Sequence, residues 1–123
     1  MGSYRDLEVW KIGRELVKAG YLFSEKLPES ERFGLKSQIQ RAAVSVPANI
    51  AEGAGRNSDP SFAQFARVAL GSLNELDTLI CPALDVGLAS EADARPLVAL
   101  IRDLSVRLRN LITRLCRADK PAQ

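Results

Sequence analysis

Apolar residues recur at alternating spacings of three and four along four long segments of the chain. This pattern is typical of helices that bury one face against a common core. It predicts four helices, over about residues 6–26, 31–53, 59–86 and 91–118. Four such segments with short connections favour an all-α fold, an antiparallel up-down-up-down four-helix bundle. We expect one domain over residues 4–117, with flexible termini at residues 1–3 and 118–123.

The ends of these helices are predicted from capping residues and prolines. N-caps are expected at Asp6, at Ser58 or Asp59, and at Ser90. Pro82 predicts a kink or an early end of the third helix near Cys81, because a proline removes one helical hydrogen bond.

The predicted buried positions follow from the same spacing. In chain order they are Val9, Gly13, Leu16, Gly20, Phe23 and Leu27; Leu35, Ile39, Ala43, Val46, Ile50 and Ala54; Phe62, Ala66, Ala69, Leu73, Leu76, Ile80 and Ala83; and Leu97, Ile101, Leu104, Leu108, Leu111 and Leu115. Gly13 and Gly20 each cost roughly 1 kcal/mol of helix propensity relative to alanine. We therefore expect a neighbouring helix to approach closely at both glycines.

The second predicted helix has two further faces beside its buried one. A polar face holds Gln38, Arg41, Ser45, Asn49, Glu52 and Arg56. The remaining face is small or apolar and holds Val44, Pro47, Ala48, Ala51 and Gly55. Because a monomeric bundle needs only one buried stripe per helix, the second apolar face predicts contact with another chain.

Pro47 interrupts this helix and leaves two interpretations open. A proline inside a helix costs roughly 3 kcal/mol and bends the axis. The bend either fits the helix to a neighbouring subunit or is a kink within a monomer. The polar face is equally open, since its side chains can face water or bond across a subunit contact. The predicted subunit interface comprises Val44, Pro47, Ala48, Asn49, Ala51, Glu52 and Gly55.

The amino-acid composition limits the kinds of function that we expect. The 123 residues include no histidine, so the commonest general base and the commonest transition-metal ligand are missing. We expect no enzymatic activity, no cofactor and no metal site. Cys81 and Cys116 form no C-x-x-C pattern, and we expect two buried thiols. No apolar run approaches the roughly 20 residues that span a bilayer, which predicts a cytoplasmic protein with no membrane partner.

Charge is unevenly distributed although the formal net charge is only +2. Residues 101–123 carry six basic and two acidic side chains. A solvated helix face explains this excess about as well as a phosphate-binding patch does. Elsewhere, Glu75 is a candidate partner for Arg41 or Arg67 in a buried or interfacial pair.

A resemblance to a known family is carried by three segments: YRDLEVWKIGRELV (residues 4–17), ERFGLKSQIQRAAVSVPANIAEGAGR (31–56) and FARVALGSLNELDTLI (65–80). They resemble the four-helix-bundle family of 23S ribosomal RNA intervening-sequence proteins. The resemblance implies a bundle that assembles into a ring-like homopentamer. It also implies distant kinship with the accessory protein of diversity-generating retroelements, a pentameric barrel that binds nucleic acid and a reverse transcriptase.

Two functions remain open. The first is a non-enzymatic homo-oligomer that concentrates basic side chains and binds RNA or DNA with low sequence selectivity and strong salt dependence. The second is a protein-interaction scaffold whose ring surface meets a protein partner. The residues expected to contact phosphate, with no aromatic stacking platform beside them, are Arg41, Arg56, Arg67, Arg107 and Arg114.

Overall fold

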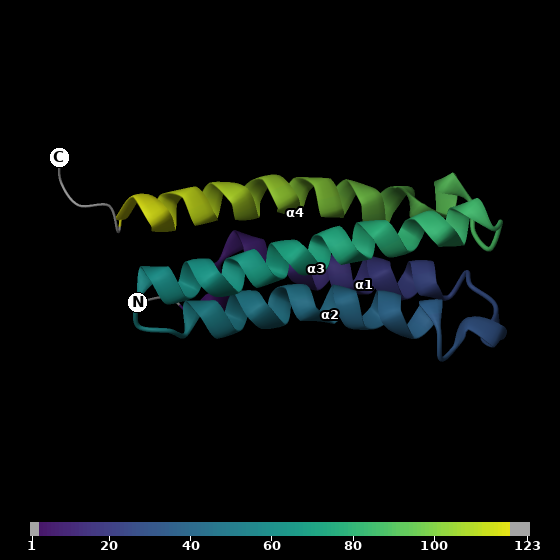
Figure 1. Cartoon of the computed structure of the whole chain (residues 1–123), viewed down its shortest axis with the longest axis horizontal. Coiled ribbons are helices and arrows are strands. Elements are labelled where there is room, and N and C mark those ends of the chain that lie inside the picture. The colour runs from purple at the N-terminus through teal and green to yellow at the C-terminus, as the bar shows by residue number, and fades with distance from the viewer. Residues whose placement is uncertain (1–2, 119–123) are drawn as a thin grey trace.

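Four long helices packed side by side make up the computed structural model, which describes residues 3–118 (Figure 1). Two short 3-10 helices, η1 (Tyr4–Asp6) and η2 (Glu29–Glu31), precede the first two long ones. Residues 3–118 contain no strand. Of the predicted flexible termini, residues 1–3 and 118–123, the structure describes only Ser3, which caps η1, and Ala118, at which α4 ends; the others lie outside the described residues. The long helices are α1 (Glu8–Ser24), α2 (Leu35–Ala54), α3 (Asp59–Asp85) and α4 (Glu91–Ala118).

The core runs between all four helices. Contacts join α1 to α2, α2 to α3, α3 to α4 and α4 back to α1. Each helix contributes at least one side chain with no exposed surface, namely Leu16, Ile39, Leu73 and Leu104. The predicted buried stripes are therefore confirmed along most of their length. The exceptions lie towards helix ends, where the side chains are only partly buried: Leu35, Ala54, Phe62 and Leu115.

The helices α1 and α2 approach each other closely at the two glycines of α1, as the sequence predicts. A Cβ atom added to Gly13 would lie 3.0 Å from the Cβ of Pro47, and one added to Gly20 would lie 3.0 Å from the Cβ of Ala43. The ring of Pro47 therefore packs on a neighbouring helix of its own chain. This contact gives the proline a role inside the single chain.

The start of α1 differs from the prediction, because Asp6 is not its N-cap. Asp6 belongs to η1, where its Oδ2 accepts a hydrogen bond from the backbone N of Ser3 at 3.1 Å. The chain leaves helical geometry at Leu7, and α1 begins at Glu8. The capping chemistry of Asp6 is thus used by a separate turn that precedes the helix.

The second long helix also begins later than predicted, at Leu35 rather than near Glu31. Its N-cap is Gly34, which has no side chain to accept a hydrogen bond. Glu31 supplies the acceptor instead, since its Oε1 lies 3.2 Å from the backbone N of Leu35. A carboxylate at this end also complements the helix dipole.

The two ends of α3 test the predictions made for this helix. Ser58 caps α3 by accepting from the backbone N of Ser61 at 3.2 Å. Of the two alternatives predicted at Pro82, the early end near Cys81 is wrong, because α3 continues through Pro82 to Asp85. The chain then turns at Gly87, whose φ of 77° favours glycine.

Ser90 caps α4 as predicted. Its Oγ accepts from the backbone N of Asp93 at 3.1 Å, and its backbone N donates to Asp93 Oδ2 at 3.0 Å. This reciprocal pair is a capping box with Asp93 as the acidic member. The hydrogen bonds from the backbone and then the side chain of Ser90 hold the pKa of Asp93 below its ordinary value.

The prediction of two buried thiols is wrong. Cys81 is exposed and Cys116 is partly exposed, and both are free. Cys81 falls outside the stripe that buries Ile80 and Ala83, and its Sγ lies 3.6 Å from the carbonyl oxygen of Asp77. An outward position on α3 explains its exposure.

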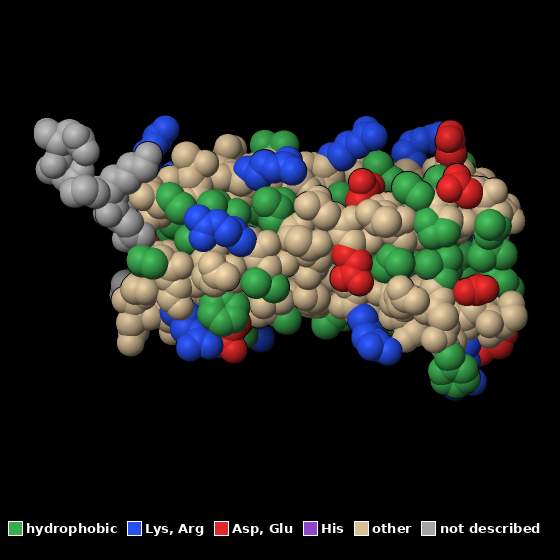
Figure 2. Space-filling model, in the orientation of Figure 1, with side chains coloured by type: hydrophobic (Ala, Val, Ile, Leu, Met, Phe, Trp, Pro, Cys, Tyr) green, Lys and Arg blue, Asp and Glu red, His purple; other side chains and the backbone are tan. Residues whose placement is uncertain are grey.

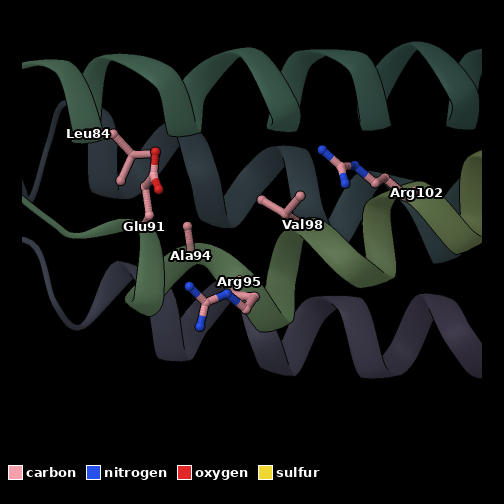
Figure 3. A pocket seen from close by; sticks show the side chains of 6 residues that line it. All are labelled: Leu84, Glu91, Ala94, Arg95, Val98 and Arg102. Atoms are coloured by element: carbon pink, nitrogen blue, oxygen red, sulfur yellow. The ribbon is translucent and has the colours of Figure 1, made fainter.

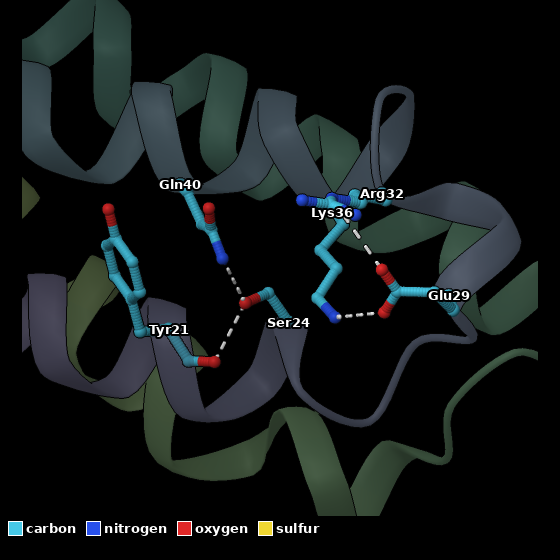
Figure 4. A network of polar contacts seen from close by, with 6 residues as sticks. All are labelled: Tyr21, Ser24, Glu29, Arg32, Lys36 and Gln40. Atoms are coloured by element: carbon cyan, nitrogen blue, oxygen red, sulfur yellow. Dashed lines mark hydrogen bonds and ion pairs between the residues drawn. The ribbon is translucent and has the colours of Figure 1, made fainter.

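A small polar network joins the end of α1 to α2 (Figure 4). Ser24 is fully buried and donates through Oγ to the carbonyl oxygen of Tyr21 at 2.8 Å, while accepting from Gln40 Nε2 at 3.0 Å. Both polar functions of the hydroxyl are used, so its burial leaves no unpaired group. Beyond it, Glu29 lies between Arg32 at 3.6 Å and Lys36 at 3.7 Å.

Candidate nucleic-acid interface

Charge divides the molecule into two sides. The first, here called the α1/α4 side, carries nine basic and five acidic residues on its two helices. The second, the α2/α3 side, carries three basic and five acidic residues on its helices. Helix α4 alone has six arginines, and Lys and Arg side chains follow its length in Figure 2. Basic residues are therefore concentrated on α1 and α4.

The arginines on the outer face of α4 form a row that the sequence analysis missed. Arg95, Arg102 and Arg109 recur every seven residues, so they share one face at intervals of roughly 10 Å. All three are exposed, and none forms an ion pair within residues 3–118. The seven-residue spacing is the signal in the sequence that identifies them. We call these three residues the α4 arginine row.

The first two arginines of this row border a hollow of about 330 Å³ between the end of α3 and the start of α4. Leu84 and Val98 give it an apolar lining. Figure 3 shows that Arg95 and Arg102 extend from α4 in different directions, with Arg102 pointing towards α3. One carboxylate, that of Glu91, shares the hollow.

Two of the five predicted phosphate contacts, Arg107 and Arg114, lie together on the other flank of α4. They line a hollow of about 290 Å³ against the start of α1, at Leu7, Glu8 and Val9. Arg107 Nε also lies 3.0 Å from Asp103 Oδ1 in an exposed ion pair. Such a pair is worth at most about 1 kcal/mol, so it competes only weakly with a phosphate.

The other three predicted contacts do not join them, because Arg41 lies on α2, Arg67 on α3 and Arg56 in the segment between these two helices. Arg56 pairs with Glu52 at 3.8 Å, and its Cζ lies 4.8 Å from the ring centre of Phe65. That ring corrects the expectation that no aromatic side chain accompanies these arginines.

Arg67 and Arg41 have neighbours of other kinds. Arg67 Nη2 donates to Cys116 Sγ at 3.0 Å. Arg41 shares a hollow of about 140 Å³ with Glu75. The suggested pairing of Glu75 with Arg41 or Arg67 is not found among the described ion pairs.

The predicted subunit-interface residues divide into exposed and partly buried groups. Asn49 is partly buried, and its Nδ2 donates within α2 to the carbonyl oxygen of Ser45 at 2.8 Å and to Ser45 Oγ at 3.0 Å. Ser45 Oγ lies 2.8 Å from Ser72 Oγ of α3. Pro47 and Ala51 are partly buried, and the exposed members are Val44, Ala48, Glu52 and Gly55.

An aromatic cluster beside arginines lies at the start of α1. Trp10 is partly buried against the core. Its ring also meets Tyr4, Arg5 and Arg14 at the surface. The spacing of residues in the sequence does not predict this cluster, because Tyr4 and Arg5 reach Trp10 only through the turn of η1.

Two other kinds of feature, a metal site and a membrane-spanning helix, were also sought among the described residues. Between residues 3 and 118, no group of three or more His, Cys, Asp or Glu side chains is placed to hold a metal ion. In the same range, no helix has the length and apolarity to cross a membrane. What the arrangement offers chemically is a cationic surface with donors for anionic oxygens.

The fold and this surface define the class of the protein. It is an all-helical protein in which four long helices surround one core and basic residues are unevenly distributed among the helices. Within that class, the chain belongs to the family of 23S rRNA-intervening sequence proteins, whose family model matches residues 5–110. The match confirms the resemblance carried by the three sequence segments. A search among curated proteins returned no match to the chain.

Proposed function

We propose that this protein is a non-enzymatic binder of RNA or other nucleic acid, and that the α1/α4 side contacts the phosphate backbone. The observation that carries the proposal is the division of charge between the two sides, nine basic to five acidic residues against three to five. Counterion release from phosphates drives association with such a surface. The absence of histidine from the sequence supports a role without general acid-base chemistry.

The α4 arginine row gives this surface its main contacts. Guanidinium groups donate to phosphate oxygens in a planar fork, and arginines without a carboxylate partner have no intramolecular bond to lose. Arg107 and Arg114 extend the surface towards α1. Because phosphate contacts carry no sequence information, we expect low sequence selectivity.

We propose an antiparallel up-down-up-down bundle as the scaffold of this surface. Residue pairs between α1 and α2 support that topology. Gly13, early in α1, lies against Pro47 near the end of α2, whereas Ser24 at the end of α1 bonds to Gln40 near the start of α2. The pairing of α2 with α3 through Ser45 and Ser72 fits the same alternation.

We propose further that copies of the chain associate through the outer face of α2, in keeping with the homopentamer that the resemblance implies. Val44 is 42% exposed there, and Ala48 and Gly55 are exposed beside it. Small side chains allow close approach of a second helix. Assembly through α2 leaves the α1/α4 side of each copy free, so that the cationic surfaces add up.

Fluorescence anisotropy with a labelled RNA oligonucleotide tests the binding function. With about three to four phosphate contacts, the affinity should fall about twenty- to fifty-fold between 50 and 200 mM salt. Absence of binding at low salt would contradict the proposal. A protein partner that stays bound in lysate after nuclease treatment, with no RNA or DNA affinity, would favour the scaffold function instead.

A further inference from the structure

We propose that Tyr4, Arg5, Trp10 and Arg14, here called the α1 aromatic cluster, bind unpaired bases of a single-stranded nucleic acid by stacking. The inference rests on the proposed function and names the form of nucleic acid that the surface takes. It depends on three features of the cluster, namely its geometry, its rigidity and the charges beside it.

The cluster brings two aromatic rings and two guanidinium groups together. The ring centres of Tyr4 and Trp10 lie 5.2 Å apart with their planes at 72°. Arg5 Cζ lies 5.3 Å from the Trp10 ring centre and 5.8 Å from that of Tyr4. Arg14 Cζ lies 5.4 Å from the Trp10 ring centre. Aromatic rings and guanidinium planes are the surfaces on which nucleobases stack.

The turn of η1 holds this cluster in place. Ser3 Oγ accepts from the backbone N of Arg5 at 3.1 Å, and the backbone N of Leu7 donates to the carbonyl oxygen of Tyr4 at 3.0 Å. The bond from Ser3 N to Asp6 Oδ2 closes the turn. A platform fixed before binding loses little conformational entropy when a base arrives.

Positive charges lie beside the cluster, where they can bind the phosphate backbone of a nucleic acid whose base is stacked there. Trp10 and Arg14 line a hollow of about 350 Å³ with Lys11, Lys18 and Glu15. Lys11 and Lys18 are exposed, so the hollow offers three cationic groups against one carboxylate. Stacking at Trp10 would place the adjoining phosphate within reach of these cations.

Stacking of this kind selects the unpaired strand. In a duplex each base face is covered by its neighbours, whereas the bases of loops and single strands can stack on protein side chains. The α4 arginine row, by contrast, contacts phosphates that both forms present. The cluster, whose turn η1 contacts α1 and α2, therefore adds affinity for single strands at a place apart from the α4 arginine row.

A second aromatic–arginine pair in the chain provides a matched control. Phe33 is 89% exposed, and Arg32 Cζ lies 5.2 Å from its ring centre. Its surroundings differ, because Glu29 and Glu31 lie close by in the chain and balance the charges of Arg32 and Lys36. Phe33 has the stacking chemistry without the cationic hollow.

The test uses the intrinsic fluorescence of Trp10, the single tryptophan of the sequence, together with anisotropy. Single-stranded RNA should quench Trp10 and bind about ten-fold more tightly than a duplex of the same sequence and length. The variant Tyr4→Leu should lose most of that preference and keep its duplex affinity. Phe33→Leu should change neither value. Tyr4 is exposed, so its replacement avoids the core contacts that Trp10→Leu would disturb.

The outcomes separate this inference from the proposed function. If both RNA forms bind equally and Trp10 is not quenched, the stacking site is wrong while the phosphate-binding function stands. An unchanged preference in Tyr4→Leu would likewise overturn the stacking site. If neither form binds at low salt, the proposed function itself is wrong.

Discussion

The α1/α4 side and the α2/α3 side share one core but differ at their surfaces. On the first, arginines extend from the outer face of α4 with no ion pair at Arg95, Arg102 or Arg109 in the described part of the chain. On the second, short polar groups such as Ser45 and Ser72 bond to each other between the helices. Residues that satisfy each other internally have less to offer a ligand.

Residue type alone does not mark a binding surface. Arg56 and Arg102 are both exposed arginines, yet Arg56 already meets Glu52 and Phe65. A phosphate at Arg56 must compete with those neighbours. At Arg102 it meets a cation without an ion-pair partner in the described residues.

The largest expected effect concerns self-association on the α2/α3 side. Ala48→Arg places a long charged side chain on the exposed outer face of α2, where the proposal expects a second copy. We expect the assembled protein to dissociate to the 13.4 kDa chain, because an unpaired charge cannot be buried at an interface. Light scattering measures the mass.

The matched control for Ala48→Arg is Ala99→Arg, the same change at an exposed position of α4. It should leave the mass unchanged. Equal masses for both variants and for the unmodified chain would argue that the outer face of α2 is not covered by another copy.

The next prediction compares two glycines on the same side. A Cβ added to Gly53 would lie 2.7 Å from the Cβ of Phe65 and 3.3 Å from the carbonyl oxygen of Phe62, whereas one added to Gly71 meets nothing within 4 Å. Gly53→Ala should lower the free energy of unfolding by about 1–3 kcal/mol through overpacking. Gly71→Ala should raise it by about 1 kcal/mol through helix propensity.

Urea denaturation of the two glycine variants measures both changes. Similar stabilisation of the two would show that α2 and α3 do not approach as closely at Gly53 as the structure places them. The experiment thus examines how rigidly the α2/α3 side is packed.

The smallest expected effect lies at the start of α4. Asp93 has a pKa held below its ordinary value by Ser90. Its contribution to stability is therefore present above the unfolded pKa of about 3.9 and is lost as the pH falls through the lowered folded value. Asp93→Asn should be slightly less stable than the unmodified chain at neutral pH, and the difference should vanish in strong acid. Thermal unfolding measured from neutral pH to strong acid tests this prediction. A stability difference between the two proteins that does not change with pH would contradict the capping box.

Much of the fold is predictable from the sequence because its determinants are local. The spacing of Leu97, Ile101 and Leu104 identifies the buried stripe of α4 without reference to any other helix. Capping by Ser58 and Ser90 likewise depends on residues three positions away. The prediction for Asp6 is wrong because a turn and a helix use the same capping chemistry, and the sequence does not show which of them forms at this position.

The candidate site is less predictable because it depends on neighbours from other helices. Whether Arg67 is available depends on Cys116, 49 residues further along the chain. The exposure of Cys81 depends on which face of α3 meets the core. The seven-residue spacing of the α4 arginine row is visible in the sequence, but the lack of ion-pair partners for these arginines among the described residues is not.

A matched pair of double charge reversals tests the central claim most directly. Arg102→Glu with Arg109→Glu alters the α1/α4 side, and Arg41→Glu with Arg67→Glu makes the same change in net charge on the α2/α3 side. In RNA anisotropy at low salt, the first pair should weaken binding by about ten-fold or more, and the second by only about two- to three-fold. Equal losses in the two pairs would contradict the assignment of binding to the α1/α4 side.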